Sequence, residues 1–200
     1  INLDAAHELN QVPVTLSVSA FYNEINDGIN ILTPEGNSAT TYVNISTNKT
    51  LGGNFRADYK GNSLNAGVGL SHIGRYQALR DDDNVPDFVY ATEVVARSQY
   101  TFNQPRLTLS AFYKYTGPLK RYSLVEEDIR LVGQDGFHTL DFNTTKSFGT
   151  SFRVGLGIRN ALNVTRINST GGGGVHSGGD SAPVGFGRSY FLTLNYQFKK

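Results

Sequence analysis

The chain of 200 residues carries 18 Lys and Arg against 17 Asp and Glu, a net charge of +1, which excludes a nucleic-acid partner held by bulk charge. Its 12 Phe and 11 Tyr exclude a disordered chain, and no run approaches the ~18 apolar residues that a membrane-spanning helix needs. The absence of cysteine removes disulfides, thiolate metal sites and cysteine nucleophiles.

Apolar and polar residues alternate along most of the chain. Between positions 64 and 71, for example, Leu, Ala, Val and Leu alternate with Asn, Gly, Gly and Ser. Because successive residues of a strand point to opposite faces, such a segment presents one apolar and one polar face. No segment keeps the 3.6-residue period of an amphipathic helix, so the sequence predicts an all-β fold.

Clusters of turn residues divide the chain into nine predicted strands. These strands cover residues 1–9, 14–32, 42–59, 64–76, 91–102, 107–121, 138–148, 152–167 and 187–198. The short breaks between them lie at 10–13, 60–63, 103–106 and 149–151. The long breaks, which alternate strictly with the short ones, lie near 33–41, 77–90, 122–137 and 168–186. This alternation predicts that all the long breaks share one end of the structure and all the short ones the other.

Two architectures produce such a pattern. A soluble sandwich buries the apolar face in a core, whereas an outer-membrane barrel turns that face to lipid. Several segments supply the ~9–11 residues of a tilted membrane-spanning strand, and the break lengths alternate as they do in such barrels. Aromatic residues also gather near strand ends, where the girdles of a membrane barrel lie. They are Tyr100, Phe102, Tyr113, Tyr115, Phe148, Phe152, Tyr190 and Phe198.

The face opposite the apolar one is too polar for a dry core. It includes Arg56, Asp58, Arg97, Gln99, Asp141, Asn143, Arg153 and Arg159. Unpaired charges in a dry core would each cost several kcal/mol, whereas the interior of a membrane barrel is polar. The sequence therefore predicts a transmembrane antiparallel β-barrel, with the soluble sandwich as the less favoured alternative.

The chain resembles the C-terminal part of TonB-dependent outer-membrane receptors. Residues 187–198, GRSYFLTLNYQF, match the family's last strand, G-R-x-(F/Y)-x-(L/V)-x-(L/V)-x-Y-x-F, although two lysines follow. Residues 157–163, GIRNALN, resemble its G-x-x-N-L-F-N motif, with Ala-Leu in place of Leu-Phe. Upstream, residues 21–29 resemble the family's F-Y-x-x-I-x-D-x-I strand, and residues 42–53 resemble, more loosely, its Y-x-N and G-(V/L)-E strands.

The resemblance implies a 22-stranded barrel with an N-terminal plug, of which residues 1–200 would supply about the last nine strands. The plug, the Ton box and the earlier strands would lie upstream. The chain opens without Met or a signal-peptide pattern, which we expect of a processed chain or of a piece of a longer one. Residues 112–117, FYKYTG, and the glycine run at 171–174 resemble receptors of Bacteroidota type in particular.

The same resemblance implies a receptor in the bacterial outer membrane that admits a scarce nutrient when TonB pulls on the plug. The substrate stays open between a siderophore, haem, cobalamin, a glycan and a peptide. Expected partners are outer-membrane lipid, the TonB complex through the upstream part, and a surface lipoprotein. No nucleophile–base arrangement is visible, so no enzyme is predicted. The alternative is a small self-contained outer-membrane barrel with a structural or adhesive role, and an outer-membrane enzyme is a weaker third reading.

Candidate ligand and metal residues lie in the long breaks. His176, Arg80 and Asp180 are placed to meet a ligand, and His176 suits haem in particular. An acidic cluster comprises Asp81, Asp82, Asp83 and Asp87. Its oxygens are the ligands that calcium takes, but the EF-hand spacing is missing, so a solvated loop is favoured. The glycine run lacks the Lys-Ser/Thr pair of a P-loop and predicts a flexible loop, which leaves loop calcium as the one cofactor considered.

Overall fold

A computed structural model describes residues 1–9, 12–32, 41–76, 86–125, 128–170 and 181–198. All the regular structure in these residues is β-strand, as predicted. The strands are β1 (Asn2–Leu9), β2 (Val14–Leu32), β3 (Thr41–Lys60), β4 (Leu64–Tyr76), β5 (Phe88–Phe102), β6 (Leu107–Thr116), β7 (Leu119–Val125), β8 (Asp128–Gln134), β9 (Phe137–Phe148), β10 (Phe152–Arg159), β11 (Arg166–Thr170), β12 (Ser181–Pro183) and β13 (Ser189–Tyr196). No helix in this part of the chain is long and apolar enough to cross a membrane.

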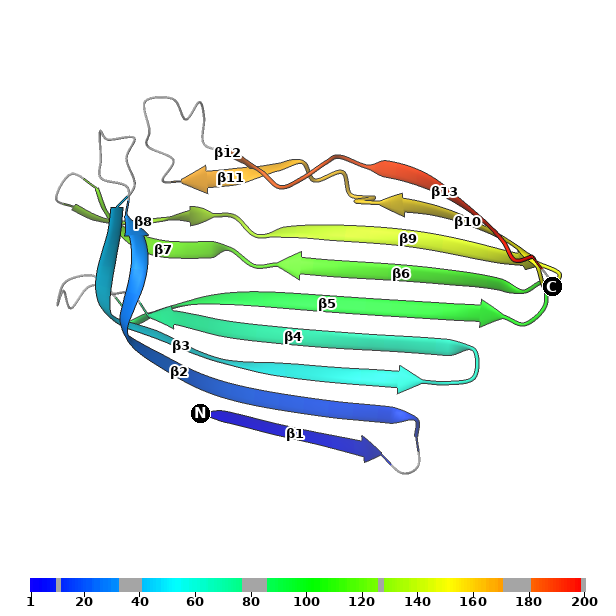
Figure 1. Cartoon of the computed structure of the whole chain (residues 1–200), viewed down its shortest axis with the longest axis horizontal. Helices are drawn as coiled ribbons and strands as arrows, with labels where there is room; N and C mark the ends of the chain where they lie inside the picture. Colours follow the sequence, from blue (N-terminus) through cyan, green and yellow to red (C-terminus); the bar gives the residue numbers. More distant parts are fainter. Residues whose placement is uncertain (10–11, 33–40, 77–85, 126–127, 171–180, 199–200) are drawn as a thin grey trace.

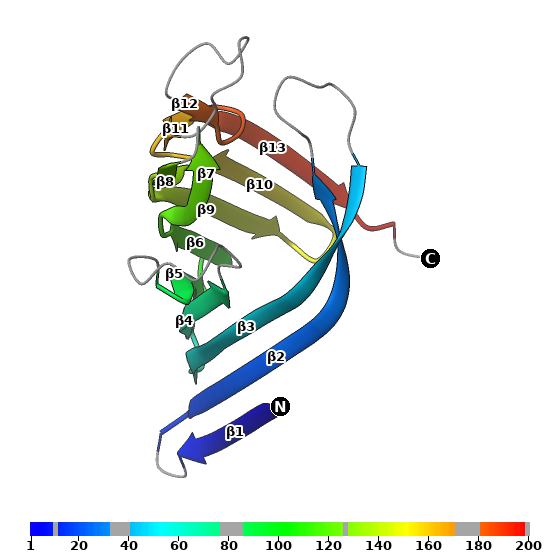
Figure 2. The ribbon, with the colours of Figure 1, turned by 90° about the vertical axis from the view of Figure 1, so that its left-hand side faces the viewer.

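One large antiparallel sheet dominates the structure. Nine strands follow one another in the order β1-β2-β3-β4-β5-β6-β9-β10-β13, and each is joined to its neighbour along the sheet by an antiparallel ladder. The strands lie side by side in Figure 1, and Figure 2 shows that the sheet curves along an arc from β1 to β13. β1 and β13 are the two edges of this sheet. These nine strands correspond to the nine predicted from the sequence.

The pairing register separates apolar from polar side chains, because directly opposite residues lie on the same face of a sheet. One row of partners runs Ile158, Phe142, Ala111, Ser98, Ala66 and Tyr59 across β10, β9, β6, β5, β4 and β3. The next row runs Asp141, Phe112, Arg97, Gly67 and Asp58. Arg159 follows Ile158 on β10 and therefore lies on the same face as this second row. We call the face of the first row the apolar face and that of the second row the polar face.

The sheet does not enclose a hydrophobic core. Among the described residues, Val132, at 8% exposure, is the one buried hydrophobic side chain, and no polar side chain is buried. Large apolar side chains such as Leu156, Leu192 and Leu194 are instead exposed on the apolar face. A soluble sandwich would bury these side chains against a second sheet, so this arrangement argues against that alternative.

Two predicted loops are wrong, because part of each forms a second sheet. β7 overlaps the start of the break expected at 122–137 and β8 lies within it. β11 overlaps the start of the break expected at 168–186 and β12 lies within it. They form a four-stranded sheet in the order β12-β11-β8-β7, beyond the ends of β6, β9 and β10 (Figure 1). The strands predicted at 107–121 and 152–167 are each interrupted where the chain passes from one sheet to the other.

The interruption after β6 has a local cause. Gly117 donates its N–H to the Thr92 carbonyl over 2.7 Å, and a Cβ at Gly117 would lie 2.5 Å from that oxygen. Only a residue without a side chain fits this close approach. Pro118 follows and has no N–H to continue a ladder, so β6 ends at Thr116 and β7, which belongs to the second sheet, starts at Leu119.

The connections differ at the two ends of the large sheet. The short connections β1–β2, β3–β4, β5–β6 and β9–β10 share one end, which we call the short-turn end. The strand ends that flank the long connections share the opposite, long-segment end (Figure 1). This confirms the predicted separation of the two kinds of break. Aromatic pairs lie at the short-turn end, with ring centroids 4.6 Å apart for Tyr100–Phe102 and 5.9 Å for Phe148–Phe152. Rings also pair near the long-segment end, where Tyr115 and His138 are stacked with their centroids 4.7 Å apart.

Candidate functional site

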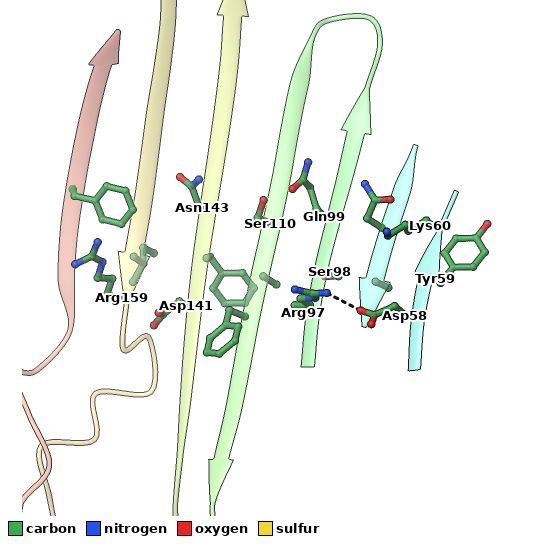
Figure 3. A pocket seen from close by; sticks show the side chains of 17 residues that line it. Asp58, Tyr59, Lys60, Arg97, Ser98, Gln99, Ser110, Asp141, Asn143 and Arg159 are labelled. Carbon is green, nitrogen blue, oxygen red and sulfur yellow. Dashed lines mark hydrogen bonds and ion pairs between the residues drawn. The ribbon is translucent and has the colours of Figure 1, made fainter. Parts of the chain in front are cut away.

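A groove of about 650 Å³ crosses the polar face of the large sheet. It is bounded by two rows of side chains that run across the strands (Figure 3). The side chains of the polar face that line it are Asp58, Lys60, Asn65, Arg97, Gln99, Ser110, Phe112, Asp141, Asn143, Arg159 and Phe191. The groove therefore combines charged, amide, hydroxyl and aromatic groups contributed by β3, β4, β5, β6, β9, β10 and β13.

An ion cluster centred on Asp58 forms one end of the groove. The Asp58 carboxylate accepts hydrogen bonds from Arg56 Nε over 2.5 Å and from Arg97 Nη2 over 2.7 Å. Its side chain is only 16% exposed, while those of the two arginines are more than half exposed. Because both partners are charged and hydrogen-bonded, these contacts hold the two guanidinium groups in place.

The contact between Asp58 and Arg97 crosses a whole strand. Asp58 lies on β3 and Arg97 on β5, and Gly67 of β4 lies between them in the register. A Cβ at Gly67 would lie 2.5 Å from Asp58 Oδ1 and 3.1 Å from Arg97 Nε. Figure 3 shows the contact between Asp58 and Arg97. The missing side chain of Gly67 is therefore what allows the two charges to meet.

Uncharged hydrogen-bonding groups form the next row of the groove. Asn143, Ser110, Gln99 and Asn65 are successive register partners on β9, β6, β5 and β4. Within the described residues, none of these four side chains has a hydrogen-bond partner. Amides and hydroxyls each donate and accept, so the row offers both kinds of group to whatever faces it.

The other end of the groove is aromatic and cationic. The Phe191 ring of β13 lies directly over Gly157 of β10, where a Cβ would overlap it. The Arg159 guanidinium sits 5.2 Å from the centre of that ring, within the range of a cation–π contact. Beside it, Asp141 Oδ1 accepts the Asn160 N–H over 2.7 Å.

That last contact belongs to the turn at residues 160–163, which we call the asparagine turn. Asn160 has a left-handed backbone, with φ of 49°. Its side chain exchanges hydrogen bonds with the backbone of Val164, at 2.9 and 3.0 Å, and donates to the Phe186 carbonyl over 3.1 Å. Asn tolerates this conformation better than most residues because its short side chain can bond locally.

Asn163 connects the asparagine turn to the start of the last strand. Its φ is 58°, and its Oδ1 accepts the Arg188 N–H over 2.9 Å. Arg188 Nε in turn donates to the Ala161 carbonyl over 2.9 Å. The two asparagines of the G-x-x-N motif region thus hold β10, β11 and the entry to β13 together, close to the aromatic end of the groove.

The structure describes the predicted residues of the polar face but only one of the predicted loop residues. The polar residues predicted to share one face do share it, and all but one of them line or border the groove. The exception is Arg153, which lies nearer the short-turn end in a recess of about 830 Å³. Three ligand candidates, Arg80, His176 and Asp180, lie outside the described residues, as do Asp81, Asp82 and Asp83 of the acidic cluster. Asp87 is described and exposed, and no cluster of three metal-binding side chains occurs in the described part. Ligand contacts and calcium binding in these loops stay predictions.

Sequence reasoning missed several groove residues. Lys60, Asn65, Ser110, Phe112 and Phe191 were not singled out, although all lie in phase with the predicted polar residues. Period-two counting places each of them on the polar face. Phe112 and Phe191 carry neither a charge nor a hydrogen-bonding group, so their residue type gives no signal of a polar groove.

Comparisons with known proteins identify the relatives of this architecture. Residues 1–161 match the family model described as TonB dependent receptor-like, beta-barrel. No curated protein matches the sequence. The narrower resemblance to Bacteroidota receptors is not confirmed by these matches and stays a prediction.

Solved structures share the fold over nearly the whole chain. The FrpB iron transporter from Neisseria meningitidis, in its F3-3 variant, superposes with a TM-score of 0.71 at 20% identity, covering 98% of this chain and 31% of that one. The F5-1 variant gives a TM-score of 0.69 at 20% identity, with the same coverage. The copper transporter OprC gives 0.70 at 16% identity, covering 98% of this chain and 30% of its own.

The chain thus spans about a third of the length of these structures. The matched family is one of receptor barrels and not of enzymes, in agreement with the prediction from the sequence. The family model matches residues 1–161, most of the sequence, and the nine-stranded antiparallel sheet agrees with its description as a β-barrel. The chain belongs to the family of TonB-dependent receptor β-barrels.

Proposed function

We propose that residues 1–200 form part of the barrel wall of an outer-membrane receptor that takes up a scarce nutrient with energy delivered by TonB. The observation that carries the proposal is the two-faced sheet: its apolar side chains are exposed as a barrel wall exposes them to lipid, and its opposite face is a polar groove. In this arrangement the polar face lines the barrel interior, and the long-segment end faces the outside of the cell.

The groove supports a role in passage rather than in chemistry. Its arginines are held by Asp58 and by the Phe191 ring, while the uncharged row between them has free hydrogen-bonding capacity. Such a wall can contact a polar ligand, or a plug, with many weak hydrogen bonds. Weak contacts suit a transport path, because a ligand has to leave each of them again.

The substrate and the partners follow from the same proposal. FrpB is named for iron and OprC for copper, so iron and copper complexes are the first ligands to assay, before haem, cobalamin, glycans and peptides. TonB would engage a segment upstream of these residues, and a surface lipoprotein would meet the long-segment end.

The alternative of a small closed barrel finds less support. Closure of a nine-stranded barrel would require β1 to pair with β13, and these strands are the opposite edges of the sheet (Figure 2). An open edge at membrane depth leaves backbone groups without partners.

Uptake by cells that carry or lack the parent gene tests the proposal. We expect deletion to reduce accumulation of one labelled nutrient, and the full gene to restore it. A protonophore, or loss of TonB, should then stop accumulation while leaving surface binding intact. Accumulation that continues without TonB and without a proton gradient would identify a passive pore and contradict the proposal.

A further inference from the structure

A second groove, of about 570 Å³, crosses the apolar face of the large sheet. One wall is the row Tyr190, Ile158, Phe142, Ala111 and Ser98, and the other is the row Leu156, Thr144, Leu109 and Tyr100. The residues that lie between these rows, such as Gly157 and Ser110, point to the polar face and therefore contribute the floor with their backbone. The groove is thus a narrow, largely apolar channel on the membrane side of the wall.

One residue in the second row of this groove has a shorter side chain than its neighbours. Thr144 of β9 pairs with Leu156 on one side and with Leu109 on the other. A short side chain therefore stands between two leucines. We call this position the gap; it lies on the side of the groove that faces the short-turn end.

A lysine lies next to that gap. Lys146 is two residues beyond Thr144 on β9, about 7 Å along the strand, and its register partners Leu107 and Val154 place it on the apolar face. Its ammonium sits 5.5 Å from the centre of the Phe148 ring. No carboxylate of the described residues lies within salt-bridge distance of it.

Lys146 differs in this respect from the other lysine of the apolar face. Lys49 pairs with Glu24 over 3.7 Å, near the long-segment end. A cation that faces lipid is costly unless it reaches the polar level of the membrane or finds an anion. Because Phe148 and Phe152 belong to the aromatic ring pairs of the short-turn end, Lys146 lies at the depth of the lipid headgroups there.

We propose that Lys146 and the groove beyond Thr144 bind one phospholipid of the membrane leaflet at the short-turn end. The ammonium of Lys146 pairs with the lipid phosphate, since lysine is a compact point charge well suited to that group. One acyl chain passes over Thr144 and lies in the groove between Phe142 and Leu156. An anionic head and an apolar tail are the two features that the cation and the groove complement.

The inference rests on the membrane placement of the apolar face and not on uptake. A receptor that fails to transport any nutrient would leave it intact, and a failure to bind lipid would leave the proposed uptake intact. A protein partner is the competing occupant, and it would cover the groove without needing a free cation at the gap.

The test is native mass spectrometry of the full receptor after incorporation into bilayers of phosphatidylethanolamine and phosphatidylglycerol and gentle extraction. We expect the wild-type receptor to retain a bound phospholipid and Lys146→Gln to bind phosphatidylglycerol about fivefold more weakly, equivalent to about 1 kcal/mol. Lys146→Arg, which keeps the charge, should retain the lipid. Thr144→Leu, which closes the gap and keeps the charge, should lose it.

Controls separate the outcomes. Lys60→Gln removes the same charge from the polar face and should retain lipid as the wild type does. Inorganic phosphate alone should not displace the lipid, because it has no tail for the groove. Equal retention by Lys146→Gln and wild type would overturn the proposal, and so would displacement by phosphate or a dimer that excludes lipid. If Thr144→Leu does not fold, as judged by the heat-modified gel shift of barrels, the Lys146→Gln and Lys146→Arg pair still decides.

Discussion

Three strand glycines provide room for side chains of the neighbouring strands. Gly67 admits the contact between Asp58 and Arg97, Gly157 lies under the Phe191 ring, and Gly74 lies under the Tyr90 ring. In each case an added Cβ would approach the neighbour closer than ordinary van der Waals contact. Glycine usually weakens a strand, so its use here indicates that the cross-strand contact matters at that position.

The first prediction tests Gly67. Replacing it with Ala should separate Asp58 from Arg97 and lower the free energy of unfolding of the full receptor by about 1 kcal/mol. Urea titration followed by the gel shift of folded barrel measures the change. Gly155→Ala is the matched control, because Gly155 also lies on the polar face but its Cβ would meet neighbours at an ordinary 3.5 Å or more. Equal effects of the two substitutions would contradict the bridging role.

The second prediction concerns the asparagine turn. Asn160→Ala should lower the free energy of unfolding by about 2 kcal/mol, because Ala disfavours the left-handed backbone and loses the side-chain hydrogen bonds. Asn160→Gly keeps the backbone conformation and should cost less. Leu162→Ala, in the same turn at an exposed position, serves as the control. A loss in Leu162→Ala as large as in Asn160→Ala would show that the hydrogen bonds are unimportant.

At the scale of elements, the last strand illustrates how far the sequence pattern reaches. The prediction of a final strand at 187–198 matches β13, and the register places Tyr190, Leu192, Leu194 and Tyr196 together on the apolar face. Alternation is strong there because each face meets a different medium. The same alternation predicts the other strands of the large sheet.

The third prediction tests the membrane side of β13. Leu194 is 61% exposed on the apolar face, and Leu194→Arg should destabilise the receptor by roughly 2–4 kcal/mol if the residue lies near the bilayer midplane. Thr193→Arg, one residue away on the polar face, should cost much less. Unfolding of the receptor in lipid vesicles, monitored by the gel shift of the folded barrel, gives the free energy of unfolding of both variants. A larger loss for Thr193→Arg would reverse the assignment of the two faces.

The second sheet could not be predicted in the same way. β7, β8, β11 and β12 extend beyond the large sheet, where neither face has to meet hydrocarbon. Without that requirement the period-two pattern fades, and polar residues with Gly and Pro predict loops. The candidate site shows the same limit. The alternation of polar and apolar residues predicts the charged residues of the groove, whereas Phe112 and Phe191 have apolar side chains that do not indicate a polar groove. The contact across Gly67 depends on the pairing of three strands, which alternation alone does not give.

At the scale of the whole molecule, the open edges of the sheet lead to the fourth prediction. Residues 1–200 expressed alone should not form a stable barrel, because β1 and β13 would leave unpaired N–H and C=O groups at membrane depth. Refolding in detergent should give aggregate, and co-expression of the upstream part of the parent receptor should rescue folding. A monomer that shows the gel shift of a closed barrel would contradict this and favour the small-barrel alternative.

The pairing between β8 and β11 has a consequence for attempts to change ligand preference. Ser169 and Thr170 pair with Gln134 and Gly133, and Asn168 Nδ2 donates to Asp135 Oδ2 over 2.9 Å, so two surface segments far apart in sequence form one sheet. A transplant of either segment from a related receptor would bring a strand whose new neighbour does not fit it. The two segments, residues 117–136 and 160–188, therefore make a single exchangeable cassette, and chimeric receptors should be built by moving both together.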